Sequence, residues 1–207
     1  MTLSPFLSRL WRVALFGALI VTGHAAFADD AIETKAKICA TCHGEQGVPM
    51  QKAFPVIWGQ NAGYLFLQLR DFQSGARKND LMSPIAGTLA REDLLPLAEY
   101  FSKLKWPDLQ QPPAPADVAA TAQKAVAAIG CIGCHLDHFQ GDGSTARLAG
   151  QNHDYLLKTM TDFRDRTRGN NPGMSDLMKA TSPDAITALA AYLAGMQIDQ
   201  YLSGQGH

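Results

Sequence analysis

Two pentapeptides decide the fold of this chain: Cys39-Ala40-Thr41-Cys42-His43 and Cys131-Ile132-Gly133-Cys134-His135. Each has the pattern CxxCH, which is the attachment signature of a c-type haem. Two thiols on one helical turn can each form a thioether with one vinyl group of a haem, and the histidine that follows can then bind the iron. The sequence therefore predicts two covalently attached haem c groups, with His43 and His135 as axial iron ligands.

Paired cysteines also have other uses. Four cysteines can form two disulfides, and a CxxC pair suits a thioredoxin-type redox site or a zinc site. A thioredoxin-type site needs a strand followed by a helix, and the sequence shows no sustained strand-type alternation. A zinc site does not explain a histidine directly after both pairs. Haem attachment accounts for the cysteines and the histidines together.

The two CxxCH sequences lie 92 residues apart, and shorter motifs recur at almost the same offset. The recurring residues are Gly59-Gln60-Asn61 and Gly150-Gln151-Asn152, Tyr64 and Tyr155, Asp71 and Asp162, Arg77 and Arg168, and Asn79 and Asn170. Most of these matches run at an offset of 91, and one residue inserted near Met174 restores the offset of 92. Such self-similarity indicates two copies of one structural unit.

The apolar spacing within each copy predicts helices. Leu65, Leu69 and Phe72 are spaced by four and three residues, which marks one face of a helix. Ser182 followed by Pro183 predicts a helix start, because serine caps helices and proline is favoured at the first helical position. The predicted helices cover residues 30–40, 61–73, 91–104, 117–129, 153–165 and 183–196. The predicted fold class is therefore all-α, with each copy wrapped around one haem.

The N-terminus has the layout of a cleavable secretory signal. Arg9 and Arg12 precede a short apolar run at residues 13–21, and Ala26-Phe27-Ala28 offers the small residues of a cleavage site. Between the two copies, four prolines within residues 107–116 favour an extended linker. The predicted organisation is a signal peptide at 1–28, an N-terminal haem c domain at 29–106, a proline-rich linker at 107–116 and a C-terminal haem c domain at 117–207. The mature chain is expected in the periplasm.

The repeat also selects candidates for the sixth iron ligand. Met82 follows His43 by 39 residues, and Met174 follows His135 by the same 39 residues. Both methionines are preceded by turn residues, and we expect each to lie in a loop that covers one haem face. A methionine ligand raises the reduction potential and fills the coordination sphere, which suits electron transfer. Met178 is the rival candidate for the second haem, one helical turn beyond Met174, and a bis-histidine second haem is a further alternative.

In combination these motifs resemble the cytochrome c4 family of dihaem class I cytochromes. The resemblance covers residues 30–197 and implies two tandem class I cytochrome c-like domains, with the haems close to the domain interface. In that family a proline carbonyl before the Gly-Gln element can orient the axial histidine. Pro55 fits this role in the first half, whereas Ala146 stands at the matching place in the second half. We therefore expect the two haems to differ in reduction potential.

The resemblance implies an electron carrier rather than an enzyme. The expected partners are redox proteins: a donor of the cytochrome bc1 type or a dehydrogenase, and a terminal oxidase or reductase as acceptor, with only loose membrane association through those complexes. The net charge of −1, without a basic block, argues against nucleic acid. The alternatives are a tightly bound subunit of a sulfide or alcohol dehydrogenase, and a dihaem peroxidase or thiosulfate-oxidising enzyme. Arg77 and Arg168 could pair with haem propionates or lie on the solvated surface.

Overall fold

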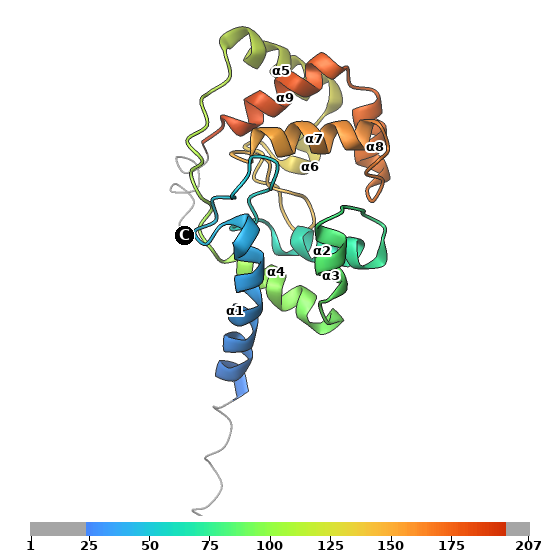
Figure 1. Cartoon of the computed structure of the whole chain (residues 1–207). Helices are drawn as coiled ribbons and strands as arrows, with labels where there is room; N and C mark the ends of the chain where they lie inside the picture. Colours follow the sequence, from blue (N-terminus) through green and yellow to red (C-terminus); the bar gives the residue numbers. More distant parts are fainter. Residues whose placement is uncertain (1–23, 198–207) are drawn as a thin grey trace, which may run out of the picture.

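The computed structural model of the protein describes residues 24–197, with the backbone alone defined for residues 24–30. Over this range the structure is helical and has no strands, which confirms the predicted fold class (Figure 1). The first half contains α1 (His24–His43), α2 (Ala62–Ser74), α3 (Met82–Gly87), the 3-10 turn η1 (Arg91–Asp93) and α4 (Leu94–Ser102). The second half contains α5 (Ala116–Ile129), α6 (Ile132–His135), α7 (His153–Arg164), α8 (Pro172–Lys179) and α9 (Pro183–Ala194).

The ends of these helices follow from local sequence. Ser182 caps α9 by accepting a hydrogen bond from the backbone N–H of Ala185, and Pro183 is the first helical residue, as predicted. Gly75 ends α2 in the left-handed conformation, with φ of 77°, which a residue with a side chain seldom adopts. The predicted signal peptide lies mostly outside the described residues. Within residues 24–197, no helix combines the length and apolar character that a membrane span needs.

Each half builds its own apolar core, and the two cores differ in size. In the first half α2 packs on α4 and α3, and α1 packs less extensively on α4, whereas in the second half α5 and α7 both pack on α9. The buried cluster of the first half is Ala36, Leu65, Leu97, Ala98 and Phe101. The cluster of the second half is Ala122, Phe139, Ala149, Leu156, Met160, Phe163, Met178, Ile186, Ala188, Leu189, Ala190, Leu193 and Ala194.

The repeated Gly-Gln-Asn elements join the two halves. Gln60 Nε2 donates to the carbonyl oxygen of Arg147 at 2.9 Å, and Gln60 Oε1 accepts from the N–H of the same residue at 2.7 Å. Gln151 makes the same pair of bonds to Val56, at 2.9 and 2.7 Å. Both glutamine side chains are buried. The repeat therefore places one amide from each half against one peptide unit of the other, in a reciprocal arrangement.

The segment between the halves is extended and lies against the second half. Residues 107–115 have no helix or strand, and α5 begins at Ala116. Gln111 Nε2 donates to the carbonyl oxygens of Gln151 at 2.9 Å and Ala194 at 3.1 Å, while its Oε1 accepts from the N–H of His153. These bonds hold the connecting segment in place, since each one satisfies a backbone group that has no helical partner.

Candidate haem sites

The two predicted axial histidines have matching surroundings. His43 ends α1 and is 6% exposed, and His135 ends α6 and is 8% exposed. His43 Nδ1 lies 2.8 Å from the carbonyl oxygen of Pro55, and His135 Nδ1 lies 2.9 Å from that of Ala146. A neutral imidazole that donates from Nδ1 keeps the Nε2 lone pair for a metal. Both rings are thus oriented as iron ligands need to be.

Burial favours the neutral form of both rings. It lowers the pKa of His43 and of His135 below the usual histidine value, although the hydrogen bonds to the two carbonyl groups oppose the shift. A neutral imidazole is the form that binds iron, because the imidazolium has no free lone pair. In the second half Ala146, which stands at the place of Pro55, supplies the carbonyl oxygen at 2.9 Å.

The cysteines are unpaired, as haem attachment requires. All four are free thiols, so the disulfide alternative is not realised. Burial raises the pKa of the Cys39 and Cys131 thiols. In the described part of the chain, no group of three or more His, Cys, Asp or Glu side chains is arranged to hold a metal ion, which leaves the zinc alternative without a ligand set.

The two predicted methionine ligands occupy equivalent places, but not in loops. Met82 is the first residue of α3, and Met174 is the third residue of α8, so the loop placement expected from the sequence is wrong. The reason is local hydrogen bonding: Asn79 Oδ1 accepts from the N–H of Met82 at 2.9 Å just ahead of α3, and Asn171, the N-cap of α8, accepts from the N–H of Met174 at 3.1 Å. Met82 therefore begins a short helix, and Met174 lies in the first turn of another.

The rival methionine has a different environment. Met178 is 3% exposed and belongs to the apolar core of the second half, whereas Met174 is only partly buried and packs at the edge of that core. A core side chain surrounded by protein is less available to an iron than one at the edge. The assignment of Met82 and Met174 as ligands stays a prediction.

Other features of the structure fit a haem in each half. The indole Nε1 of Trp58 is buried and has no hydrogen-bond partner among the described residues, so a propionate oxygen would supply a missing acceptor. Exposed apolar side chains also flank the predicted attachment residues, as the flat apolar face of a haem needs. Ile38 directly precedes Cys39, Leu81 directly precedes Met82, Leu136 directly follows His135, and Ile132 lies between the second pair of cysteines. The donor set and its surroundings therefore suit the group.

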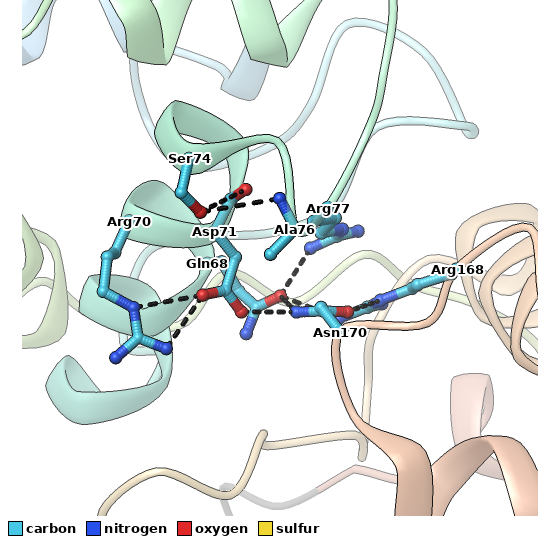
Figure 2. A network of polar contacts seen from close by, with 8 residues as sticks. All are labelled: Gln68, Arg70, Asp71, Ser74, Ala76, Arg77, Arg168 and Asn170. Atoms are coloured by element: carbon cyan, nitrogen blue, oxygen red, sulfur yellow. Dashed lines mark hydrogen bonds and ion pairs between the residues drawn. The ribbon is translucent and has the colours of Figure 1, made fainter.

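Arg77 and Arg168 belong to a polar network between the halves (Figure 2). Arg77 donates to the hydroxyl oxygen of Tyr155 at 3.2 Å, and Arg168 donates to that of Tyr64 at 3.2 Å. Arg168 is 5% exposed and Arg77 is partly buried, so the alternative of solvated surface arginines is wrong. Each guanidinium also stacks on an aromatic ring of its own half, with Cζ 4.5 Å and 4.3 Å from the ring centroids.

Sequence reasoning missed Gln68, which lies at the centre of this network. Its Oε1 accepts from Arg77 at 2.9 Å, from Arg168 at 2.8 Å and from Asn170 at 3.1 Å. The matching residue of the second half is Thr159, one of many positions at which the two copies differ along these helices. No signal in the sequence therefore singles out Gln68.

Known proteins of similar sequence and structure agree with this arrangement. No family model matches the chain. The thiosulfate dehydrogenase electron acceptor of Stutzerimonas stutzeri is 34% identical over 90% of this chain and 94% of that protein. Cytochrome c4 of Azotobacter vinelandii is 31% identical over 89% of this chain and 97% of that protein.

A solved structure supports the same relationship at the level of the whole fold. The crystal structure of reduced recombinant cytochrome c4 from Pseudomonas stutzeri superimposes with a TM-score of 0.73 at 29% identity, over 82% of this chain and 98% of that chain. The matches extend over both halves, and the chain has a CxxCH sequence in each. This chain belongs to the cytochrome c4 family of dihaem c-type cytochromes, which carry electrons.

Proposed function

We propose that the protein is exported to the periplasm, where it carries electrons from a quinol-oxidising complex or a dehydrogenase to a terminal oxidase or reductase. The proposal includes removal of residues 1–28, two haem domains at 29–106 and 117–207, and a linker at 107–116. Its iron ligands are His43 and Met82 for the first haem and His135 and Met174 for the second. The haems supply reversible one-electron chemistry when bound.

One observation supports the proposal above the others: the two histidine sites are equivalent and the halves that hold them are bonded reciprocally. His43 and His135 each meet a backbone carbonyl at 2.8–2.9 Å, and the glutamines Gln60 and Gln151 fix one half against the other. Such an arrangement keeps two redox centres at a constant separation. Fixed geometry favours electron exchange between them, since little reorganisation accompanies each step.

A second candidate for the electron donor is an enzyme that oxidises thiosulfate. The relative from Stutzerimonas stutzeri is named as the electron acceptor of a thiosulfate dehydrogenase, and a second relative with that name, from Thiomonas intermedia, is 33% identical over 92% of this chain. We infer that a thiosulfate dehydrogenase is a suitable donor for this cytochrome. On this view the chain accepts electrons and does not itself oxidise thiosulfate.

The test begins with the purified, exported holoprotein. We expect two haems per chain, a methionine-sulfur-to-ferric-iron band in the near infrared scaled to both, and no spectral change when carbon monoxide is added to the reduced form. Carbon monoxide binding at one haem would contradict the methionine ligation and favour an enzyme. Stopped-flow reduction by a bc1-type complex with quinol, against a thiosulfate dehydrogenase with thiosulfate, then distinguishes the two donors.

A further inference from the structure

The two methionine-bearing segments are anchored differently, although they derive from one repeat. In the first half, Asn79 Oδ1 accepts from the N–H groups of Leu81 and Met82 of its own half, and residues 78–82 make no described hydrogen bond to the second half. In the second half an extra asparagine precedes the helix. Asn171 is the N-cap of α8 and accepts from the N–H of Met174, so the Asn170 side chain is not needed as the cap and makes another contact.

Asn170 uses that freedom to reach the first half. Its Nδ2 donates to Asp71 Oδ2 at 2.8 Å and to Gln68 Oε1 at 3.1 Å, both on α2 (Figure 2). Asp71 is 6% exposed, and its other oxygen, Oδ1, accepts from Nε and Nη2 of Arg70 at 3.1 and 2.8 Å. The carboxylate is thereby held between the two groups, and hydrogen bonds to a buried carboxylate are stronger than neutral ones.

The matching residues of the second half do not return this contact. Asp162 is bonded to Lys158 and Thr167 of its own half, and Thr159 accepts only from Arg168 among the hydrogen bonds described for its hydroxyl oxygen. Threonine at this position is shorter than Gln68 by two bonds, so it cannot span the interface as the glutamine does. The replacement of Gln68 by Thr159 and the inserted asparagine together make the interface one-sided.

We propose that Asp71 and Gln68 are positioning residues for the second haem: acting through Asn170, they fix the segment that presents Met174, whereas the matching residues Asp162 and Thr159 make no such contact with the Met82 segment. The inference rests on the proposed function, in which Met174 is an iron ligand. Asn170 lies four residues before Met174, separated from it only by the N-cap Asn171 and the first two residues of α8, so a displacement of Asn170 is carried to Met174 through a short stretch of backbone. The first half thus controls the ligation strength, and with it the potential, of the second haem.

The experiment compares Asp71→Ala with the matched variant Asp162→Ala, and adds Gln68→Thr, which gives the first half the residue of the second. The readouts on the holoprotein are the NMR signals of the two ligand methionine ε-methyl groups in the reduced state and the two midpoint potentials. A Met82→His variant assigns the signals. In Asp71→Ala we expect the Met174 signal to shift and broaden and the second midpoint potential to fall, with Met82 unchanged. Gln68→Thr should shift the Met174 signal in the same direction, less strongly; because Gln68 also accepts from Arg77 of the first half, the Met82 signal serves as the control only in Asp71→Ala.

Asp162→Ala is expected to leave both methionine signals in place. Equal disturbance of Met82 and Met174 in Asp71→Ala, an unchanged Met174 signal in both Asp71→Ala and Gln68→Thr, or the same effect in Asp162→Ala would overturn the proposal. Gln68→Thr decides the matter if Asp71→Ala does not fold. Absence of two methionine signals from the unmodified protein would instead contradict the proposed function itself, before any variant is compared.

Discussion

The two halves of this cytochrome are copies of one repeat, but their apolar cores differ in size and in the helices that form them. In the second half α5 and α7 both lie on α9, and thirteen buried residues form a continuous core. The first half has five residues in its cluster, and α1 contacts chiefly α4. A unit of this size is marginal without a cofactor or a partner. The first half therefore depends more strongly on its haem and on contacts with the second half.

The interface between the halves has a symmetric part and an asymmetric part. The contacts of Gln60 and Gln151 are reciprocal, whereas the contact of Asn170 with the first half has no counterpart from the first half to the second. Gln60 and Gln151 form the same pair of bonds in each direction. Gln68, by contrast, accepts hydrogen bonds from residues of both halves at its single Oε1 atom. The comparison indicates that duplication supplied a symmetric junction, and that single substitutions then gave each half a separate role.

Removal of one haem should produce the largest difference between the halves. In a Cys39→Ser/Cys42→Ser variant we expect α2 and α4 to lose most of their protection from hydrogen exchange, because the small core of the first half cannot hold them alone. In Cys131→Ser/Cys134→Ser, α5, α7 and α9 should keep substantial protection. Hydrogen exchange followed by mass spectrometry measures both. Equal loss of protection in the two variants would contradict the unequal dependence on haem.

Removal of one interface glutamine tests the symmetric part of the junction. Gln60→Ala orphans the buried N–H and C=O of Arg147, and Gln151→Ala orphans those of Val56. Each orphaned group costs about 1–3 kcal/mol, so both variants should lose stability clearly and by similar amounts in denaturant unfolding. Gln123→Ala, on the exposed face of α5, is the control and should change stability by less than about 0.5 kcal/mol. Markedly unequal losses of stability in the two variants would show that the two glutamines do not contribute equally to the interface.

Much of the fold could be predicted from the sequence because it depends on local patterns. The apolar spacing around Leu65 and Phe72 predicted α2, and the Ser182-Pro183 pair predicted the start of α9. The resemblance to the cytochrome c4 family predicted that the carbonyl group of Pro55 orients the axial histidine, and His43 meets that carbonyl group. These features follow from a few neighbouring residues and from a repeat that can be read directly.

The rest depends on which polar side chain faces the other half, and no local pattern encodes that. The asparagines before Met82 and Met174 are predicted as turn residues, but the sequence did not predict their hydrogen bonds to the N–H groups of the two methionines. Arg77 and Arg168 were weighed as surface residues, yet each reaches a tyrosine of the opposite half. Contacts between residues about 80 to 100 positions apart in the chain become visible only once the halves are placed together.

A smaller difference should arise at the carbonyl groups that orient the histidines. Pro55 has a fixed φ, so its carbonyl group is held more rigidly than that of Ala146. In Pro55→Ala the hydrogen bond from His43 should loosen, which makes the imidazole a weaker donor to the iron and raises the potential of the first haem modestly. A redox titration resolved into two components measures this, with the second component as internal control. A shift of both components by the same amount would contradict a local effect.

The smallest expected effect is a dependence of stability on pH at Tyr155. Burial raises the pKa of its hydroxyl, but the guanidinium groups of Arg77 and Arg168 outweigh it and lower the pKa to about 7. The folded pKa lies below the unfolded value of about 10, so the contribution of this group is fully present above pH 10 and is lost as the pH falls through 7. The stability of the unmodified protein relative to Tyr155→Phe should therefore rise between pH 6 and pH 9 in denaturant unfolding. Replacement of Arg77 by Gln should move that rise to higher pH, because one of the two stabilising cations is gone. A constant difference across this range would mean that Tyr155 stays protonated, and that the arginines serve the interface through hydrogen bonds alone.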